Sequence, residues 1–191
     1  MKNEYKNIKG TKDIFPPESY NYKIIEDFIH QTLQSYGYGE IRTPFFENTN
    51  LFKRGIGNET DIVSKEMYSW IDQGGDELTL RPELTAPVIR AYNQHQLTST
   101  SPITRLYYLS NLFRRERPQK GRQRQFSQYG VEALGSSYPE QDVEVISIAY
   151  NIYKMLNLNN ISVKINTIGS PEIRDKYLME LKESIQKFSN D

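Results

Sequence analysis

The sequence predicts an α+β fold in which helices flank a mainly antiparallel β-sheet. The strand-like runs, within residues 66–81 and 103–135, are joined by hairpin signals rather than by regular βαβ alternation. Segments with apolar residues at helical spacing precede and follow these strands. At 191 residues the chain is long enough to bury a core. We therefore expect one domain, or one domain and the start of another.

The first predicted element is an amphipathic helix that begins after the turn-forming Pro16-Pro17 and ends at Gly37. Its apolar residues recur at helical spacing, at Ile24, Ile25, Phe28, Ile29 and Leu33. Tyr38–Phe46 then indicates a strand interrupted at Pro44, because proline lacks the N–H that a β-ladder requires. Such a strand suits a boundary or an interface.

Two antiparallel hairpins are expected in the middle of the chain. Glu66–Ile71 and Glu77–Arg81 flank the segment from Asp72 to Asp76, a hairpin signal because glycine supplies the positive φ that a tight turn needs. Ile103–Arg115 and Arg124–Gly135 flank a polar, basic connection that suits a mobile loop. Between the hairpins, Glu83–His95 predicts a helix, in which the single proline is tolerated only within the first turn.

The last third of the sequence predicts a helix, a strand and another helix. Pro139–Leu156 has one apolar stripe and acidic residues in its first turns. Ile161–Ile168 indicates a final strand. Gly169-Ser170-Pro171 then precedes a charged helix, Glu172–Phe188. Its weaker apolar stripe indicates a helix that needs a further packing partner.

Composition excludes several classes of function. Lysine plus arginine and aspartate plus glutamate each number 24, so attraction to polyanions requires a local patch. Zero cysteines exclude disulfides, thiol catalysis and cysteine metal sites, and the two histidines, His30 and His95, lie far apart. A histidine-rich metal site is therefore not expected, a bound metal would need oxygen ligands, and we assign no metal-binding residue. No run approaches the roughly 20 apolar residues of a membrane span, so we expect a soluble, cytoplasmic protein.

A local basic patch lies in the connection between the two long strands. Six cations stand there against the single carboxylate of Glu116: Arg114, Arg115, Arg117, Lys120, Arg122 and Arg124. Such a run suits an exposed turn, a nucleic-acid contact or a clamp for nucleotide phosphates, whose geometry the arginine fork matches. Charge alone does not separate these three alternatives.

Alternation along the second long strand helps to choose between them. One face of this strand runs from cation to carboxylate and carries Arg124, Phe126, Gln128, Gly130 and Glu132. Gly130 is expected to leave a hollow in which a small ligand lies close to the backbone. A ligand that is anionic at one end and protonated at the other, such as an aminoacyl adenylate, fits this polarity. The alternative is an ordinary solvent-facing polar face.

Two other segments contain candidate site residues. Glu83 can neutralise an ammonium group and Thr85 lies near it, although both residue types also suit helix capping. Residues 54–61 contain two glycines but match neither the Walker pattern nor the dinucleotide fingerprint. A plain turn is therefore favoured over a phosphate loop for residues 54–61.

These segments resemble the histidyl-tRNA synthetase family, whose class II catalytic domain is a mainly antiparallel sheet flanked by helices. The similarity to motif 2 of that family lies in Phe113–Arg122, Arg124–Phe126 and Gln128–Glu132. Three further segments agree in order: Lys9–Asp13, the motif 1-like Glu40–Pro44, and Leu80–Pro87. The resemblance covers nearly the whole chain.

The resemblance implies a role for each candidate residue. The implied histidine ligands are Glu83, Thr85 and Gln128 at the α-amino group and Glu132 at the imidazole. The implied ATP ligands are the catalytic Arg114 at the α-phosphate, Glu116 at the adenine, and Arg122 and Arg124 toward the outer phosphates. The implied reaction is attack of the histidine carboxylate on the α-phosphorus of ATP, followed by transfer of the histidyl group to tRNA-His.

The resemblance also implies partners. Mg²⁺ would accompany the ATP phosphates, since it commonly binds through waters and substrate oxygens. The family is a homodimer with motif 1 at the interface, which gives Phe45 and Phe46 a possible role in self-association. Burial of both rings in the core of the domain is the alternative.

The sequence departs from the family pattern in two respects. Ser110-Asn111 replaces the usual Gly-Pro pair before Phe113, which we interpret as tolerated variation. Motif 3, the family's histidine-binding arginine and tyrosine segment, and an anticodon-binding domain do not follow Asp191. We expect residues 1–170 to be the N-terminal part of the catalytic domain and 171–191 to lead into an absent remainder. Efficient aminoacylation by this chain alone is not expected.

Two rival functions stay open. A synthetase-like regulatory subunit of ATP phosphoribosyltransferase would bind histidine without charging tRNA, but the complete Glu116–Arg122 loop favours the catalytic family. A nucleic-acid-binding module would use the basic hairpin directly. Phe113 and Phe126, however, flank the loop instead of alternating with its cations as a stacking platform requires.

Overall fold

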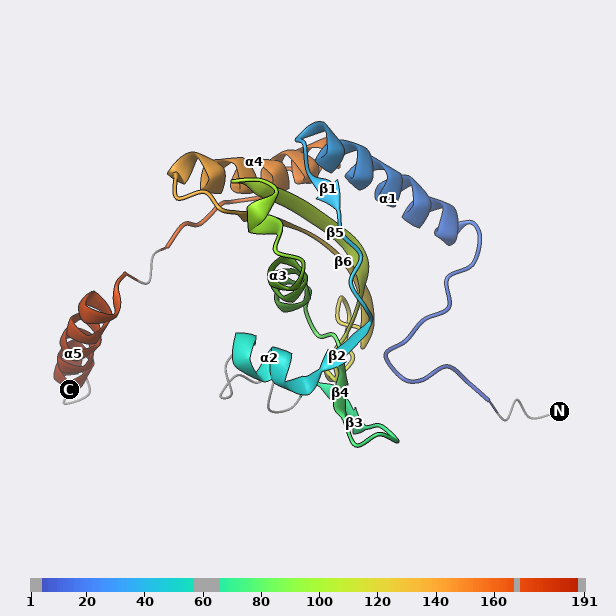
Figure 1. The fold of residues 1–191 in the computed structure, drawn as a ribbon, viewed down its shortest axis with the longest axis horizontal. Helices are drawn as coiled ribbons and strands as arrows, with labels where there is room; N and C mark the ends of the chain where they lie inside the picture. Colours follow the sequence, from blue (N-terminus) through green and yellow to red (C-terminus); the bar gives the residue numbers. More distant parts are fainter. Residues whose placement is uncertain (1–4, 57–65, 167–168, 189–191) are drawn as a thin grey trace.

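The computed structural model describes residues 5–56, 66–166 and 169–188, and it confirms the α+β class (Figure 1). The helices are α1 (Glu18–Ser35), α2 (Thr49–Ile56), α3 (Thr85–Gln94), α4 (Pro139–Met155) and α5 (Pro171–Phe188), with a 3-10 turn at Leu97–Ser99. The strands are β1 (Gly39–Glu40), β2 (Phe46–Asn48), β3 (Tyr68–Ile71), β4 (Glu77–Leu80), β5 (Thr104–Phe113) and β6 (Gln125–Leu134).

The larger sheet is built around the long β5–β6 hairpin. Its strand order is β1-β5-β6, with β1 parallel to β5 and β5 antiparallel to β6. The hairpin register runs from Thr104 opposite Leu134 to Phe113 opposite Gln125. Helices α1 and α4 cover one face of this hairpin, and α3 lies against the other (Figure 1). The predicted antiparallel pairing of the two long strands is therefore confirmed.

The two faces of the hairpin carry separate apolar cores, because side chains alternate along each strand. On the face toward α1 and α4, Tyr107 of β5 packs against Leu33 and Ile152. On the face toward α3, Tyr108 and Leu112 pack against Val88, with Phe126 beside them. The even-numbered residues of β6 thus face α3, as the sequence alternation predicts.

The smaller sheet corrects one prediction. Its order is β2-β4-β3, and both pairs are antiparallel. Tyr38–Phe46 is not one strand interrupted at Pro44: β1 pairs with β5 of the larger sheet, whereas β2 pairs with β4 of the smaller one. The segment between them is irregular because its carbonyl oxygens accept hydrogen bonds from the Arg81 side chain instead of from a neighbouring strand. The β3–β4 hairpin is confirmed.

Residues 54–61 also differ from the predicted plain turn. Arg54 lies in the last turn of α2, a helix that no sequence pattern predicted, and the part from residue 57 onward lies outside the described residues. The buried ring of Phe52 explains why this short helix forms, because it attaches α2 to the body.

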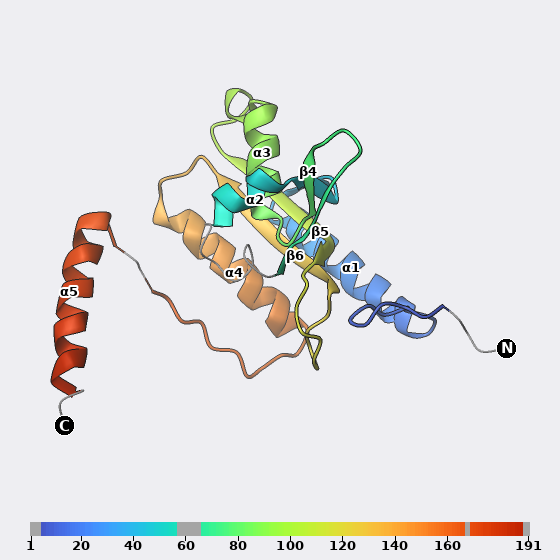
Figure 2. The ribbon, with the colours of Figure 1, turned by 90° about the horizontal axis from the view of Figure 1, so that it is seen from below.

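The C-terminal region contains a second correction. Residues 161–166 form no strand, and Val163 and Ile165 are 50% and 80% exposed. The apolar residues indicated a strand, but no described strand lies beside this segment to supply a β-ladder. Ile168 lies outside the described residues. Helix α5 follows as predicted and stands apart from the body (Figures 1 and 2).

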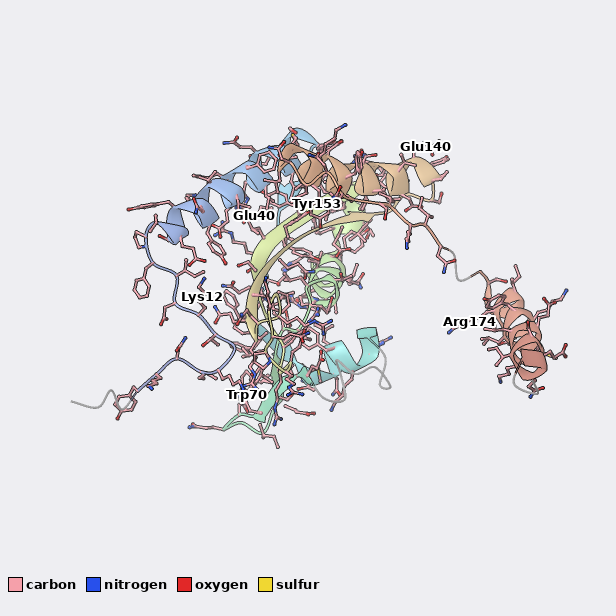
Figure 3. The ribbon with its side chains drawn as sticks, turned by 180° about the vertical axis from the view of Figure 1, so that it is seen from behind. Lys12, Glu40, Trp70, Glu140, Tyr153 and Arg174 are labelled. Carbon is pink, nitrogen blue, oxygen red and sulfur yellow. The ribbon has the colours of Figure 1, made fainter. Side chains whose placement is uncertain are left out.

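Figure 3 shows the body from behind, with Trp70 on the smaller sheet, Tyr153 on α4 at the opposite end, and Arg174 on the separate α5. None of the described helices is both long and apolar enough to cross a membrane.

Candidate active site

Glu83 lies between β4 and α3, where the chain turns from the smaller sheet toward the larger one. Its carboxylate accepts hydrogen bonds from the backbone N–H of Ala86, at 3.0 and 3.3 Å, so it caps the first turn of α3. Burial raises the pKa of Glu83, and the nearby charge of Glu132 raises it further. The capping role is therefore present, but it leaves a half-buried carboxylate close to a second one.

Glu132 belongs to β6 and reaches the start of α3. The Thr85 hydroxyl donates to Glu132 Oε1 at 2.7 Å, which joins residues that are 47 positions apart in the chain. Burial raises the pKa of Glu132, although hydrogen bonds from Thr85 and Tyr108 act in the opposite direction. Among the described residues, no ion pair involves Glu83 or Glu132. A cation is the ligand that this pair of carboxylates lacks.

Tyr108 is a site residue that no sequence pattern indicated. It lies opposite Gly130 in the β5–β6 register, and a Cβ added to Gly130 would collide with the Tyr108 hydroxyl. The Tyr108 ring therefore occupies the space directly above Gly130, while Gly130 still lines the hollow between Gln128 and Glu132. The hydroxyl interacts with Thr85 and Glu132, and burial raises its pKa to about 12. Sequence alone gave no signal for this contact, which depends on the cross-strand register.

A hollow of about 590 Å³ lies along the free edge of β6 beside these groups. Gln128, Glu132, Thr85 and Tyr108 are among the residues that line it. Three of the four predicted histidine ligands therefore share one cavity. Glu83, the fourth, lines a neighbouring pocket together with Thr85.

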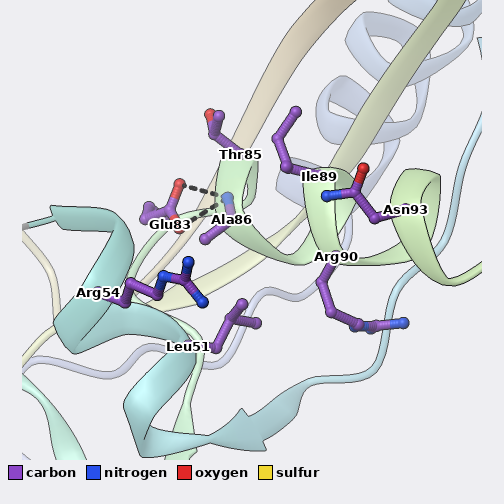
Figure 4. A pocket seen from close by; sticks show the side chains of 8 residues that line it. All are labelled: Leu51, Arg54, Glu83, Thr85, Ala86, Ile89, Arg90 and Asn93. Atoms are coloured by element: carbon purple, nitrogen blue, oxygen red, sulfur yellow. Dashed lines mark hydrogen bonds between the residues drawn. The ribbon is translucent and has the colours of Figure 1, made fainter.

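That neighbouring pocket, of about 610 Å³, lies between α2 and α3 (Figure 4). Figure 4 shows the Glu83 carboxylate on Ala86 at one side, with Arg54 extending from α2 across the pocket and Arg90 on α3. Arg90 forms an ion pair with Glu47. Thr85 thus lies on the boundary between the two hollows.

A third hollow, of about 500 Å³, lies at the base of the basic loop. It is lined by Arg114, Glu116, Arg122 and Phe126, among others. The Arg114 guanidinium lies over the Phe126 ring, with its central carbon 5.2 Å from the ring centroid. Glu116 lies between two arginines, 3.8 Å from Arg114 Nη1 and 3.6 Å from Arg122 Nη1.

Glu116 has an unused acceptor in this hollow. Its Oε2 is buried and accepts no hydrogen bond among the described residues, although it lies 3.6 Å from Arg122 Nη1 in an ion pair. A ligand with an amino group can supply the hydrogen bond that this oxygen lacks. Arg124 points elsewhere: its Nε donates to the Glu116 carbonyl oxygen at 3.3 Å, and Arg124 is not among the residues that line the hollow.

Hydrogen bonds to the carbonyl oxygens of residues 81 and 82 bring the carboxylate pair and the arginine-lined hollow together. Arg114 Nε donates to the carbonyl oxygen of Pro82 at 2.9 Å, directly before Glu83. The N–H of Phe113 donates to the Arg81 carbonyl oxygen at 3.1 Å. The end of β5 is therefore fixed against residues 81–83, which places the cationic hollow next to the carboxylate pair.

Arg81 is the buried centre of this junction, with 1% of its surface exposed. It donates to the carbonyl oxygens of Thr43, Pro44 and Asn111 at 2.7, 3.2 and 3.0 Å. It also bonds to the Ser110 hydroxyl and lies over the Phe45 ring, 4.3 Å from the centroid. Burial lowers the pKa of Arg81.

The Ser110-Asn111 departure from the family pattern is integrated into the structure. The Ser110 hydroxyl bonds to Arg81, and the Ser127 hydroxyl donates to Asn111 Oδ1 at 3.0 Å across the hairpin. Both side chains therefore have partners that glycine and proline do not provide. Among the described residues, no group of three or more histidines, aspartates and glutamates is arranged to hold a metal ion.

The α+β fold, with a mainly antiparallel sheet flanked by helices, matches the catalytic fold of class II aminoacyl-tRNA synthetases. The family model for histidyl-tRNA synthetase matches residues 10–182. The chain therefore belongs to the histidyl-tRNA synthetase family.

Curated relatives and solved structures agree with this assignment. A histidine–tRNA ligase of Chloroherpeton thalassium is 52% identical over 172 residues, which cover 90% of this chain and 40% of that protein. One from Halothermothrix orenii is 50% identical over 183 residues, 96% of this chain and 44% of that protein. The chain thus spans less than half the length of these relatives.

Two solved structures are similar in fold. The apo histidyl-tRNA synthetase of S. aureus has a TM-score of 0.74 and 36% identity, over 91% of this chain and 40% of its own. A Bacillus halodurans C protein, described as an ATP phosphoribosyltransferase regulatory subunit/histidyl-tRNA synthetase, has a TM-score of 0.68 and 29% identity, over 82% of this chain and 39% of its own.

Proposed function

We propose that this chain supplies the histidine-binding and ATP-binding groups of a histidine–tRNA ligase. The observation that carries the proposal is the carboxylate pair Glu83 and Glu132, which has no ion-pair partner among the described residues, is joined through Thr85 and lies next to an arginine-lined hollow. Histidine supplies an ammonium group and an imidazole N–H for the carboxylates, and ATP supplies phosphates for the arginines.

In this proposal, Glu83, Thr85 and Gln128 bind the α-amino group of histidine, and Glu132 binds the imidazole. Arg114, whose Nε is bonded to the Pro82 carbonyl oxygen directly before Glu83, then binds the α-phosphate. The buried Glu116 Oε2 accepts the adenine amino group, while Arg122 and Arg124 contribute charge for the outer phosphates. Mg²⁺ accompanies the ATP phosphates, because it keeps several waters and binds mainly through substrate oxygens.

The reaction begins when a histidine carboxylate oxygen attacks the α-phosphorus of ATP. The bond from the α-phosphorus to the bridging oxygen breaks, pyrophosphate leaves, and histidyl adenylate remains. Arg114 stabilises the charge that develops on the α-phosphate, and fixed positioning contributes the rest. The histidyl group then passes to the terminal ribose of tRNA-His with release of AMP.

The partners follow from the same proposal. Arg115 and Arg117 are exposed on the loop, whereas Arg114 and Glu116 are half-buried, so the exposed cations are available for tRNA phosphates. We also propose a cytoplasmic homodimer that associates through the motif 1-like segment, because Phe45 and Phe46 remain 49% and 51% exposed.

The test is histidine-dependent ATP–pyrophosphate exchange, together with calorimetric titration of the 191-residue chain with histidine and with glutamine. We expect histidine to bind and glutamine not to bind. Arg114→Ala should reduce ATP affinity and any exchange by about tenfold or more, because it removes a charge-assisted contact. Arg115→Ala, next to it but exposed, is the matched control and should leave ATP affinity within about twofold.

The outcomes separate the rival functions. Equal binding of histidine and glutamine contradicts the proposal. Histidine binding that is unaffected by ATP and by Arg114→Ala favours the regulatory subunit. The similarity to the Bacillus halodurans C structure supports this alternative less well than the curated relatives support the ligase. Salt-dependent RNA binding without any ATP dependence favours the nucleic-acid module.

A further inference from the structure

The N-terminal segment before α1 contains a short turn that the proposed function leaves unexplained. Residues 7–12, here called the strap, lie outside the regular elements, and most residues from 5 to 17 are exposed. Gly10 and Thr11 are the half-buried exceptions within the strap. The strap therefore meets the body at these two residues. Figure 3 shows Lys12 beside the loop end of the long hairpin.

The strap is held in shape by its own hydrogen bonds. The N–H and the hydroxyl of Thr11 both donate to the Ile8 carbonyl oxygen, at 2.9 and 2.7 Å, and Asn7 Nδ2 donates to the Thr11 carbonyl oxygen at 3.0 Å. Gly10 occupies the third position of this four-residue turn with φ +90°. A turn of this type requires positive φ at that position, which favours glycine.

Gly10 contacts both limbs of the basic loop. Its carbonyl oxygen accepts a hydrogen bond from the Arg124 backbone N–H at 2.7 Å. A Cβ added to Gly10 would lie 2.8 Å from Arg124 Cγ and 2.8 Å from Pro118 Cγ. Pro118 precedes the tip of the loop and Arg124 follows it. The missing side chain of Gly10 therefore allows the strap to fit against the base of the loop.

The loop has few other attachments beyond the last rung of the β5–β6 ladder. Gln119 and Arg122 exchange two backbone hydrogen bonds at its tip, and the Arg115 N–H donates to the Glu66 carbonyl oxygen at 2.7 Å. Arg124 links the base to the site, since its Nε donates to the Glu116 carbonyl oxygen. A movement of Arg124 would therefore shift Glu116, whose carboxylate lines the hollow at the base of the basic loop.

We propose that the strap positions the basic loop for ATP, with Gly10 acting through Arg124 on the backbone of Glu116. Gly10 is a positioning residue because it touches the loop and not the hollow. The consequence for ATP rests on the proposed function, whereas the contact between the strap and the loop does not.

The experiment compares Gly10→Ala with Gly75→Ala in the full chain. Gly75 has φ +91° and nothing within 4 Å of an added Cβ, so it carries the same backbone penalty without a contact to the loop. The readouts are the rate of tryptic cleavage after Lys120 and Arg122, deuterium exchange of the Arg124 amide, and the affinities for ATP and histidine.

We expect Gly10→Ala to raise loop cleavage and Arg124 exchange by about tenfold, because both follow the population of the opened loop. The ATP Kd should rise by a similar factor while the histidine Kd stays within about twofold. Gly75→Ala should change none of these values. Thr11→Val, which removes one bond within the strap, should give a smaller change in the same direction as Gly10→Ala.

Unchanged cleavage and exchange in Gly10→Ala would overturn the proposal, as would equal effects of the two glycine variants. If Gly10→Ala unfolds the chain, seen as exchange throughout β5, Thr11→Val decides the question. If the wild-type chain binds no ATP, the proposed function fails, but the cleavage and exchange rates still test the strap.

Discussion

At the residue scale, the site contains two carboxylates whose charged forms are disfavoured by burial. Glu83 and Glu132 are half-buried carboxylates near each other, and burial raises the pKa of both. Thr85 and Tyr108 donate hydrogen bonds to Glu132 but carry no charge. Ionisation of these carboxylates therefore lowers the stability of the unliganded protein, and binding of a cationic ligand restores that stability.

Glu132→Gln should separate stability from binding. The folded state raises the pKa of Glu132, so its contribution to stability is present below the ordinary glutamate pKa and is lost as pH rises through the folded value. Glutamine keeps the shape and an acceptor for Thr85 but cannot ionise. We expect a Tm above that of the wild type at about pH 8, a smaller difference at about pH 4, and loss of histidine binding, measured by scanning calorimetry and titration.

Glu144→Gln is the control with the opposite sign. Burial alone would raise the pKa of Glu144, but hydrogen bonds from Gln141, Arg105 and Tyr38 outweigh it and lower the pKa. Its stabilising contribution is present above the ordinary glutamate pKa and is lost as pH falls through the folded value. Glu144→Gln should therefore lower the Tm at about pH 8. The same sign of change in both variants would contradict this interpretation.

Tyr108→Phe tests the tyrosine that fills the space above Gly130. The ring stays in place and the hydroxyl beside Glu132 is lost, so we expect histidine affinity to fall by about five- to tenfold, the effect of about 1 kcal/mol. The neighbouring Tyr107→Phe is the matched control. Its hydroxyl bonds to His30 and Gln34 on the opposite face of the sheet, at 2.8 and 3.3 Å. Calorimetric titration that finds equal losses in both variants would refute the assignment.

At the element scale, one buried side chain determines how the two sheets meet. Arg81 satisfies carbonyl oxygens from the segment between β1 and β2 and from β5. Without the Arg81 side chain, which is 1% exposed, those carbonyls would lose these donors. The junction therefore depends on a planar group with several donors, and a lysine cannot reproduce its geometry.

Arg81→Lys should consequently destabilise the fold by roughly 2–4 kcal/mol, since it leaves buried acceptors unpaired. Urea unfolding followed by circular dichroism measures this change. Arg42→Lys is the control, because Arg42 is exposed and pairs with Glu40 at 2.9 Å on the surface. We expect Arg42→Lys to stay within about 0.5 kcal/mol of the wild type. If Arg81→Lys lowers the free energy of unfolding by no more than the Arg42→Lys control does, other contacts hold the junction.

At the scale of the whole molecule, apolar surface remains exposed where the two sheets meet. Phe46 is 51% exposed and stacks edge-on against Trp70, with ring centroids 6.1 Å apart. We predict that Phe46→Lys raises the dissociation constant of the proposed homodimer by about tenfold or more. Val143→Lys is the control, at a site on α4 that is 60% exposed. Sedimentation velocity over a range of concentrations distinguishes the two.

A wild-type chain that stays monomeric at every concentration would contradict the proposed dimer. Equal dissociation of both lysine variants would assign the effect to charge and not to the location of Phe46. Phe45 is unsuitable for this experiment, because its ring lies under the Arg81 guanidinium and its removal would disturb the junction.

The sequence by itself determined the main elements and the polarity of the site. The helical spacing in α1 and α4, the glycine-containing turn between β3 and β4, where Gly75 has positive φ, and the alternation along β6 are local patterns, and each was confirmed because it depends on near neighbours. The even-numbered β6 residues Phe126, Gln128, Gly130 and Glu132 share a face as expected. The residues of the basic loop were enough to indicate the family, because they carry a long and specific resemblance to its motif 2.

Tertiary structure alone decided which distant residues meet. Residues 161–166 had the composition of a strand but no neighbouring strand to pair with among the described residues. Tyr38–Phe46 is divided between two sheets because the Arg81 side chain donates to the carbonyl oxygens between them. Gly130 lies beneath Tyr108, and Gly10 lies against Arg124. The physical reason is the same in each case: local periodicity fixes the direction of a side chain, whereas register and packing between distant segments fix what it touches.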